Sequence, residues 1–183
     1  LTHAFNMDGR AASLTITDKI PYLLEAGVEP IVFSAITGIK DQRFPHHQFI
    51  AWGPSGFRFD FRHWVANQYG RGLFYKVTTR AVSLLLSPLI AIEKLVLGYS
   101  SQWSWALPAF FHGWRLIRAG KVDVVFSVGS AWSAHLAGVW LKKATGIELI
   151  SEVHDPLVIR KGPDDRGIEK PKNRDARFRH YLE

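Results

Sequence analysis

The sequence predicts an α/β fold in which helices flank a parallel β-sheet. Between Val122 and Val153, a strand pattern, a short loop, a helix pattern, a glycine and a second strand pattern follow one another within about 30 residues. The N-terminal residues, Leu1 to Ser34, repeat this order of strand, helix and strand. A βαβ unit joins parallel strands through a right-handed crossover, so two such units predict a parallel sheet.

The N-terminal unit is predicted from its hydrophobic spacing and from the residues that end its elements. We expect the end of a strand over 1–5, a loop over 6–10, a helix over 11–26 and a strand over 30–34. Ile16, Ile20 and Leu23 recur at helical spacing. Pro21 should kink or restart this helix, and Gly27 should end it.

The elements of the rest of the chain are predicted in the same way. Expected strands cover 48–52, 122–127 and 147–153, and expected helices cover 72–87, 88–96, 103–119, 131–145 and a short stretch from about 174. Aromatic and charged residues alternate from Phe57 to Arg62, which favours an extended segment with one wet face.

The composition limits the class of protein. The 183 residues suit one domain, 1–183, whose part from about 157 is a charged loop followed by the short helix. The absence of Cys excludes disulfide frameworks and thiol nucleophiles. An apolar share of 47% and a charged share of 21% exclude global disorder. The most apolar stretch, Ala81 to Leu97, includes Glu93 and Lys94, so we expect no transmembrane span.

The charge and the missing motifs narrow the choice of ligands. A formal net charge of +7 allows an anionic partner, which could be nucleic acid, a membrane surface or a phosphorylated ligand. His46 and His47 have no further ligands at metal spacing, and there is no H-E-x-x-H motif. We therefore expect no metal and no cofactor.

Polar residues concentrate in three loops that follow predicted strands, over 6–10, 128–133 and 154–156. In an open parallel sheet, ligands bind in the crevice at the carboxyl ends of the strands. In the first loop, Asp8, Gly9 and Arg10 precede a helix N-terminus, where free N–H groups favour an anion. The alternative is a turn glycine beside a surface arginine.

The second and third loops supply hydroxyl, acidic and imidazole groups. Ser130 and Ser133 are candidates for ligand contacts, or else for helix capping and packing. His154 can donate a hydrogen bond or move a proton near neutral pH, and Asp155 could orient it. Glu152 lies two residues earlier and should point to the same side of the strand. The alternative for His154-Asp155-Pro156 is a simple exit from the strand.

Two stretches together resemble the N-terminal domain of family 4 glycosyltransferases, which are retaining enzymes of the GT-B fold. The stretch from Lys121 to Pro156, which reads KVDVVFSVGSAWSAHLAGVWLKKATGIELISEVHDP, is similar to the last βαβ unit of that domain. The stretch from Asp8 to Phe33 is similar to its first strand, glycine loop, helix and strand. The middle of the chain has no such similarity. The resemblance implies that this chain is a Rossmann-like domain, one half of a GT-B fold.

The resemblance also implies an activity and a role for each candidate residue. The enzyme would move a sugar of the hexosyl class from a nucleoside diphosphate to an acceptor hydroxyl with retention, without a metal. The implied roles are catalysis for His154 and Asp155, contact with the donor sugar and phosphates for Asp8, Gly9 and Arg10, and acceptor binding for Ser130, Ser133 and Glu152. The family often has Gly-Gly where this chain has Asp8-Gly9. A C-terminal domain outside this sequence would bind the nucleotide sugar, so we expect little activity from this chain alone.

The segment from Gly53 to Arg80 interleaves aromatic residues with five basic residues and one acidic residue. Such a surface suits contact with anionic lipid, so the acceptor could be lipid-linked and the enzyme could lie at the cytoplasmic face of a membrane. The alternative is that the aromatic residues pack between helices and the charges are solvated. The sequence leaves both open.

Two other functions remain alternatives. Aromatic and basic surfaces also bind single-stranded nucleic acid, so the chain could be a binding module without catalysis. No RNP, KH or helix-turn-helix pattern favours nucleic acid. The chain could also belong to an epimerase or phosphorylase of the GT-B fold.

Overall fold

Four short strands and five α-helices make up most of the described part of the chain. The computed structural model describes residues 1–7, 11–97, 102–129, 131–154 and 181. The elements are α1 (Ala11–Glu25), β1 (Val32–Ala35), β2 (His46–Phe49), α2 (Pro54–Tyr69), α3 (Leu73–Leu97), the 3₁₀ helix η1 (Trp103–Trp105), α4 (Ala106–Arg118), β3 (Val124–Gly129), α5 (Trp132–Thr145) and β4 (Glu148–Val153).

The strands form two parallel pairs, so the predicted α/β class with parallel strands is confirmed. β1 pairs with β2 from Val32 opposite His46 onward. β3 pairs with β4, and the pairing ends with Gly129 opposite Val153. Parallel strands need crossover connections, which α5 supplies between β3 and β4. The carboxyl ends of β3 and β4 therefore lie side by side.

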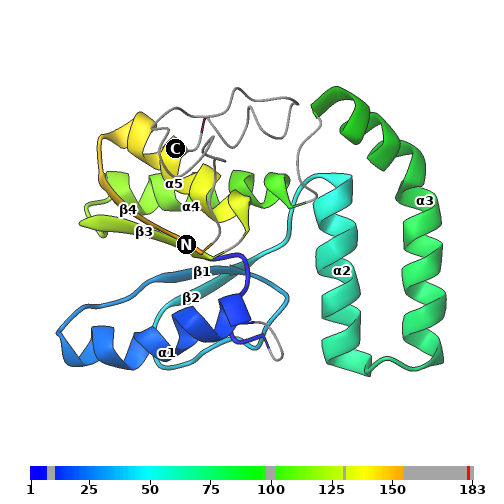
Figure 1. The fold of residues 1–183 in the computed structure, drawn as a ribbon, viewed down its shortest axis with the longest axis horizontal. Helices are drawn as coiled ribbons and strands as arrows, with labels where there is room; N and C mark the ends of the chain where they lie inside the picture. Colours follow the sequence, from blue (N-terminus) through cyan, green and yellow to red (C-terminus); the bar gives the residue numbers. More distant parts are fainter. Residues whose placement is uncertain (8–10, 98–101, 130, 155–180, 182–183) are drawn as a thin grey trace, which may run out of the picture.

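The N-terminal segment 1–5 lies between the two pairs and is hydrogen-bonded to both (Figure 1). The backbone bonds run from Thr2 N–H to Phe33 O (3.0 Å), from Ala35 N–H to His3 O (3.1 Å), from Val128 N–H to Leu1 O (3.0 Å) and from the Leu1 amine to Phe126 O (2.6 Å). Residue numbers increase together from Thr2 and Phe33 to His3 and Ala35, and Leu1 bonds with both Phe126 and Val128, the pattern of a parallel pair, so the segment runs parallel to β1 and β3. The strand end predicted over 1–5 is an irregular segment in the structure, and it joins the two pairs.

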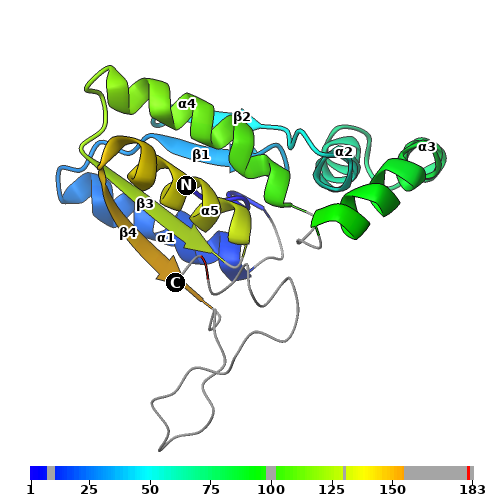
Figure 2. The ribbon, with the colours of Figure 1, turned by 90° about the horizontal axis from the view of Figure 1, so that it is seen from above.

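Helices lie on both sides of the strands (Figure 2), and apolar clusters fill the space between them. One cluster packs α4 and α5 against β1, and it comprises Phe33, Ala35, Ala51, Trp105, Ala106, Ala109, Ala134, Leu136 and Ala137. The other packs α1 on the opposite side, and it comprises Phe5, Ile16, Ile20, Val32, Phe44 and Val128. Helices on both faces explain why β1 and β3 are short, mostly buried apolar runs, whereas four of the six residues of β4 are exposed.

Most predicted helices appear within a few residues of their expected bounds. α1 matches the predicted helix 11–26, and Pro21 lies inside it without ending it. α5 ends before Gly146, as predicted. The helix predicted over 103–119 begins with the 3₁₀ turn η1 and continues as α4. The short helix predicted from about 174 lies outside the described residues, apart from Tyr181, which is helical.

The prediction of an extended segment from Phe57 to Arg62 is wrong, because these residues lie within α2. Pro54 begins this helix, where its missing N–H costs nothing, and Gly70 follows its end. Phe57 and Phe61 are four residues apart and stack at 6.0 Å between ring centroids. The aromatic residues therefore share a helical face, which the two-residue alternation conceals.

The two helices predicted over 72–87 and 88–96 are one helix, α3. Pro88 lies inside it, and Figure 1 shows that the C-terminal part of α3 changes direction. A proline removes one helical hydrogen bond and crowds the preceding turn, so a bend without a break is reasonable. α2 and α3 form a hairpin that projects from the strands (Figures 1 and 2). None of the helices in the described ranges is long and apolar enough to cross a membrane.

Candidate functional site

The described candidate residues gather at the carboxyl ends of the strands. Glu152 and His154 lie at the end of β4, and Ser133 lies in the first turn of α5, just after β3. The other predicted site residues lie outside the described residues: Asp8, Gly9, Arg10, Ser130 and Asp155. Their predicted roles remain predictions.

Glu152 lies between two basic side chains. His154 Nε2 lies 3.3 Å from Glu152 Oε1, which confirms that these two residues point to the same side. On its other side, Glu152 accepts hydrogen bonds from the Lys19 ammonium of α1 with both carboxylate oxygens. Sequence reasoning missed Lys19, because nothing near it in the sequence connects it with β4. The Glu152 carboxylate can orient the His154 imidazole, while Lys19 neutralises the charge of the carboxylate.

The Lys19 hydrogen bond lowers the pKa of Glu152 below its ordinary value, and His154 contributes less. We expect Lys19→Met to raise this pKa, measured by NMR titration of the Glu152 carboxyl group. The Lys19 and Glu152 side chains are 41% and 31% exposed, so the variant should lose less than about 1 kcal/mol of stability. Lys121→Met, at an exposed position outside this pair, is the control. An unchanged Glu152 pKa in Lys19→Met would contradict the conclusion that the Lys19 hydrogen bond lowers this pKa.

His135 of α5 holds the carboxyl end of β3 from inside. Its Nε2–H donates to Gly129 O (3.0 Å), so its Nδ1 accepts from Ser127 Oγ (3.1 Å). Burial lowers the pKa of His135, which favours this neutral form. Gly129 has φ of +113°, a conformation that strongly favours glycine. The carbonyl group at the carboxyl end of β3 is therefore held in place.

Ser133 is fully buried, and its Oγ has no hydrogen-bond partner among the described residues. The N-cap of α5 is Ala131, without a side-chain cap. The hydroxyl of Ser133 therefore does not cap the helix. A buried hydroxyl without a partner costs about 1–3 kcal/mol, so Ser133 carries an unmet donor at the start of α5.

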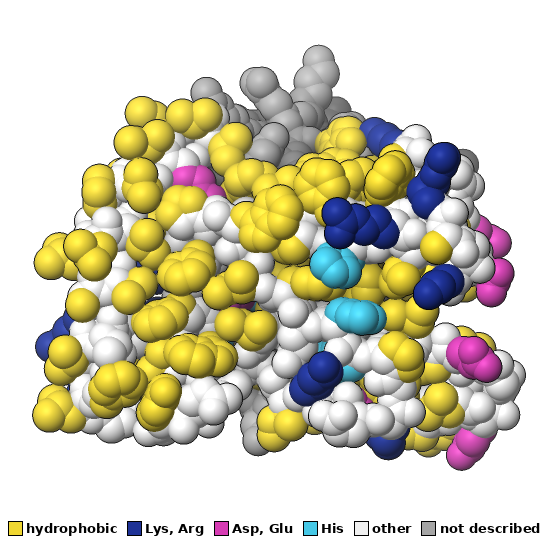
Figure 3. Space-filling model, turned by 180° about the vertical axis from the view of Figure 1, so that it is seen from behind, with side chains coloured by type: hydrophobic (Ala, Val, Ile, Leu, Met, Phe, Trp, Pro, Cys, Tyr) yellow, Lys and Arg dark blue, Asp and Glu magenta, His cyan; other side chains and the backbone are white. Residues whose placement is uncertain are grey.

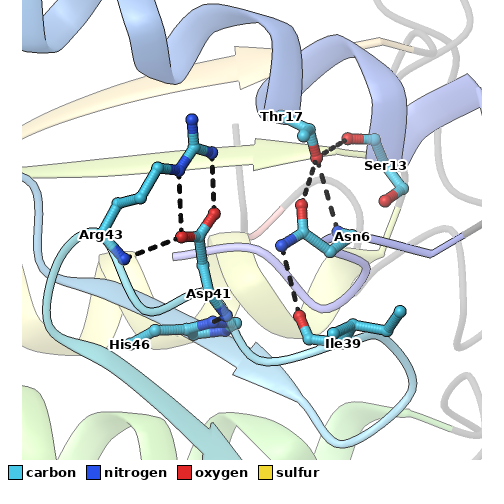
Figure 4. Close-up of polar contacts among 7 residues, drawn as sticks. All are labelled: Asn6, Ser13, Thr17, Ile39, Asp41, Arg43 and His46. Carbon is cyan, nitrogen blue, oxygen red and sulfur yellow. Dashed lines mark hydrogen bonds and ion pairs between the residues drawn. The ribbon is translucent and has the colours of Figure 1, made fainter.

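Asn6 joins the first loop to α1 and to the loop after β1 (Figure 4). Its Oδ1 accepts from Thr17 Oγ1 (3.2 Å), and its Nδ2 donates to Ile39 O (3.2 Å). Asn6 has φ of +49°, which is uncommon outside glycine. Met7 N–H donates to Ser13 Oγ (2.8 Å) at the start of α1. These bonds fix the chain just before the predicted phosphate loop Asp8-Gly9-Arg10.

The loop after β1 is itself fixed by a carboxylate–guanidinium pair. Asp41 accepts from Arg43 Nη2 (2.8 Å) and Nε (3.1 Å), and this pairing holds the pKa of Asp41 well below its usual range. The Asp41 N–H donates to Nδ1 of the buried His46 (2.9 Å), as Figure 4 shows. Polar contacts that the sequence did not reveal therefore order both the chain before the first loop and the loop after β1, which Asn6 joins to it.

A second buried polar cluster lies between the N-terminal segment and α2. His3 Nε2 lies 3.5 Å from Asp60 Oδ1, and Asp60 Oδ2 accepts from Ala51 N–H (2.8 Å). The ring of the fully buried Trp105 lies 5.6 Å from that of His3, and its Nε1 has no hydrogen-bond partner among the described residues. Asp60 belongs to α2, so this cluster ties the helical hairpin to the N-terminal segment. It escaped prediction because Phe57–Arg62 was expected to be extended.

No group of three or more His, Cys, Asp or Glu residues within the described ranges could hold a metal ion. No family model matches the chain, and neither a curated protein nor a solved structure shows significant similarity to it.

Proposed function

We propose that this chain is the Rossmann-like, acceptor-side half of a GT-B glycosyltransferase. The order of its parallel segments is the observation that carries the proposal. From one edge to the other they run β2, β1, segment 1–5, β3 and β4, which are the third, second, first, fourth and fifth in the chain. This is the order of doubly wound dinucleotide-binding sheets, in which ligands bind where the order reverses. Here that point lies between Asn6 and Gly129.

The residues at this edge suit the transfer of a sugar from a nucleoside diphosphate to an acceptor hydroxyl. In that reaction the bond between the anomeric carbon and the phosphate oxygen breaks, the acceptor oxygen forms the new bond, and its proton passes to an oxygen of the departing diphosphate. Positive charge develops at the anomeric carbon and negative charge on the departing diphosphate. His154, whose Nε2–H donates to Glu152, would present Nδ1 to the reacting centre, where the imidazolium form donates a hydrogen bond.

The remaining roles in the proposal come from the sequence resemblance. Asp8, Gly9 and Arg10 would meet the donor sugar and phosphates next to the anchored Asn6, and Asp155 would assist His154. Ser130 would contact the acceptor, which we propose to be a saccharide or lipid-linked hydroxyl at the cytoplasmic face of a membrane, whereas the buried Ser133 would support that loop from inside. A C-terminal domain would bind most of the nucleotide sugar. Retention of configuration belongs to the resemblance as well.

The proposal is tested by the release of nucleoside diphosphate from a panel of sugar nucleotides, with a membrane lipid extract as acceptor. The full-length natural protein that contains this chain is compared with its His154→Ala variant. We expect release from at least one donor, and a loss of at least about tenfold in kcat/KM in the variant, because a positioned proton donor contributes that much or more.

His112→Ala is the matched control, because His112 is an exposed imidazole on α4, far along the chain from β4. It should retain the activity of the unmodified protein. Equal activity in His154→Ala and His112→Ala would be compatible with a glycosyltransferase but would reject His154 as part of its site. No release from any donor by a folded protein would reject the glycosyltransferase.

A further inference from the structure

The α2–α3 hairpin exposes an apolar surface that the strands do not cover. On α3 this surface comprises Leu73, Phe74, Val77, Leu84, Leu85, Leu89 and Ile92, each more than half exposed. On α2 it continues with Trp64 and Tyr69. We call these nine residues the hairpin face. Figure 3 shows apolar side chains spread over the half of the molecule that carries the hairpin. Exposed apolar surface of this extent is typical of an interaction site.

The hairpin face cannot turn inward, because the opposite side of α3 is fixed. Thr79 and Ile90 are the buried residues of α3. Glu93 accepts a hydrogen bond from Ser55 N–H (2.9 Å) at the start of α2 and another from Trp103 Nε1 (2.7 Å). This carboxylate therefore sets the rotation of α3 about its axis, with its apolar side toward solvent.

Aromatic rings extend the hairpin face along α2 and across the hairpin tip. Phe61, Trp64, Tyr69 and Phe74 follow one another with centroid distances of 6.1, 6.2 and 4.9 Å. Trp and Tyr rings have an apolar body and a polar group, which suits the boundary between water and hydrocarbon. The rings thus form a row at the border of the aliphatic part of the face.

A basic hollow of about 510 Å³ lies against the buried side of α3, where Thr79 lines it, and meets the hairpin face at Leu84. Its lining combines three cations with hydroxyl groups and contains no acidic residue: Arg62, Tyr75, Lys76, Thr79, Arg80, Ser83, Leu84 and Ser87. Leu84 belongs to both the hollow and the face. Guanidinium, ammonium and hydroxyl groups are the donors that bind phosphate. A phosphate held there would lie beside an aliphatic surface, which is the arrangement of a phospholipid.

We propose that the hairpin lies in the surface of an anionic phospholipid bilayer, with the hairpin face among the acyl chains and the basic hollow on a lipid phosphate. The charges favour a bilayer over a second copy of this chain. A symmetric dimer would bring like surfaces together. The acids of the hairpin are Asp60 and Glu93, and both are engaged within the fold, so a second copy offers no carboxylate from this surface to the three cations.

The first test is the pelleting of this chain with vesicles of phosphatidylcholine, with and without phosphatidylglycerol. Leu84→Gln combined with Leu85→Gln should weaken binding at least tenfold, and the helix should persist, because both side chains are exposed and glutamine favours helices. Tyr22→Gln is the control, because Tyr22 is equally exposed on α1, and it should bind like the unmodified chain. Unchanged circular dichroism and melting temperatures verify folding.

The second test concerns the basic hollow. Lys76→Gln combined with Arg80→Gln should reduce the preference for phosphatidylglycerol roughly tenfold, because each cation near an anionic surface contributes appreciably. Arg118→Gln combined with Lys121→Gln removes the same charge from exposed positions at the end of α4 and should retain the preference. Raising the salt concentration should weaken the binding of the unmodified chain.

Three results would overturn the proposal. One is no pelleting of the unmodified chain with any vesicle, and another is equal binding by the Leu84/Leu85 variant. The third is a dimer in sedimentation without lipid that the same variant converts to a monomer while vesicle binding persists, which would assign the face to a second copy. No sugar nucleotide is present, so these outcomes are independent of the test of His154.

Discussion

Gly38→Ala is expected to destabilise the protein by at least about 3 kcal/mol, because the new methyl group has no room. A Cβ at this position would lie 1.8 Å from Phe5 O and 2.7 Å from Asn6 O, whereas real Cβ atoms keep beyond 3.0 Å. Both neighbours are backbone atoms, so no side chain can move aside. Separating them would break the bond from Ile39 N–H to Asn6 O (3.1 Å).

The free energy of unfolding of Gly38→Ala is measured by urea denaturation, with the slope checked against that of the unmodified chain. Gly72→Ala is the matched control, because a Cβ there meets nothing within 4 Å. Its effect should be small or stabilising, since alanine restricts the unfolded chain. Equal stability of the two variants would show that the loop after β1 gives way easily. Asn6 would then not be rigidly placed.

The sequence was most informative where the pattern is local. The βαβ unit that contains β3, α5 and β4 follows from short apolar runs, a helix and a glycine, all within one stretch of chain. The strand predicted over 48–52 lies two residues earlier, as β2, because its pairing with β1 decides its bounds. The segment from Phe57 to Arg62 was wrongly predicted to be extended. Its aromatic and charged residues alternate as in a strand, but the rings of Phe57 and Phe61 also lie four residues apart, as on one face of a helix.

The candidate site was predictable only in its outline. The position of His154 and its pairing with Glu152 follow from the end of a strand and its two-residue repeat. Lys19 reaches Glu152 from another element, and such a contact has no local sequence signal. The same holds for Gly38, whose crowding comes from the backbone of Phe5, distant along the chain. Contacts between elements require the packed fold.

His46 is a buried histidine whose two ring nitrogens are both engaged. Its Nδ1 accepts from Asp41 N–H, so its Nε2–H donates to Ser34 Oγ (2.8 Å), which in turn donates to Ala35 O (2.9 Å). Protonation of Nδ1 would break the first of these bonds. Burial lowers the pKa of His46 to about 4, while Asp41 opposes the shift and Lys40 and His47 add to it.

This lowered pKa makes the stability of the fold depend on pH. In the unfolded chain His46 should bind its proton near pH 6.5, whereas the folded protein resists protonation until about pH 4. Between these values the unfolded state holds the extra proton, so the free energy of unfolding falls as the pH falls. The full loss from this residue is about 3 kcal/mol, at roughly 1.4 kcal/mol per pKa unit. Above pH 7 the contribution is fully present.

Urea denaturation between pH 8 and pH 4 measures this loss, and NMR titration of the His46 ring measures the pKa directly. His46→Gln removes the titrating group, so its stability should fall less steeply with acid, although it starts lower because Asp41 N–H loses its acceptor. His112→Gln, at an exposed position, should keep the acid slope of the unmodified chain. A His46 ring that titrates near 6.5 in the folded protein, with the same slope in His46→Gln, would refute the prediction. Because His46 holds the loop that anchors Asn6, acid should loosen the loops around the candidate site at the same pH.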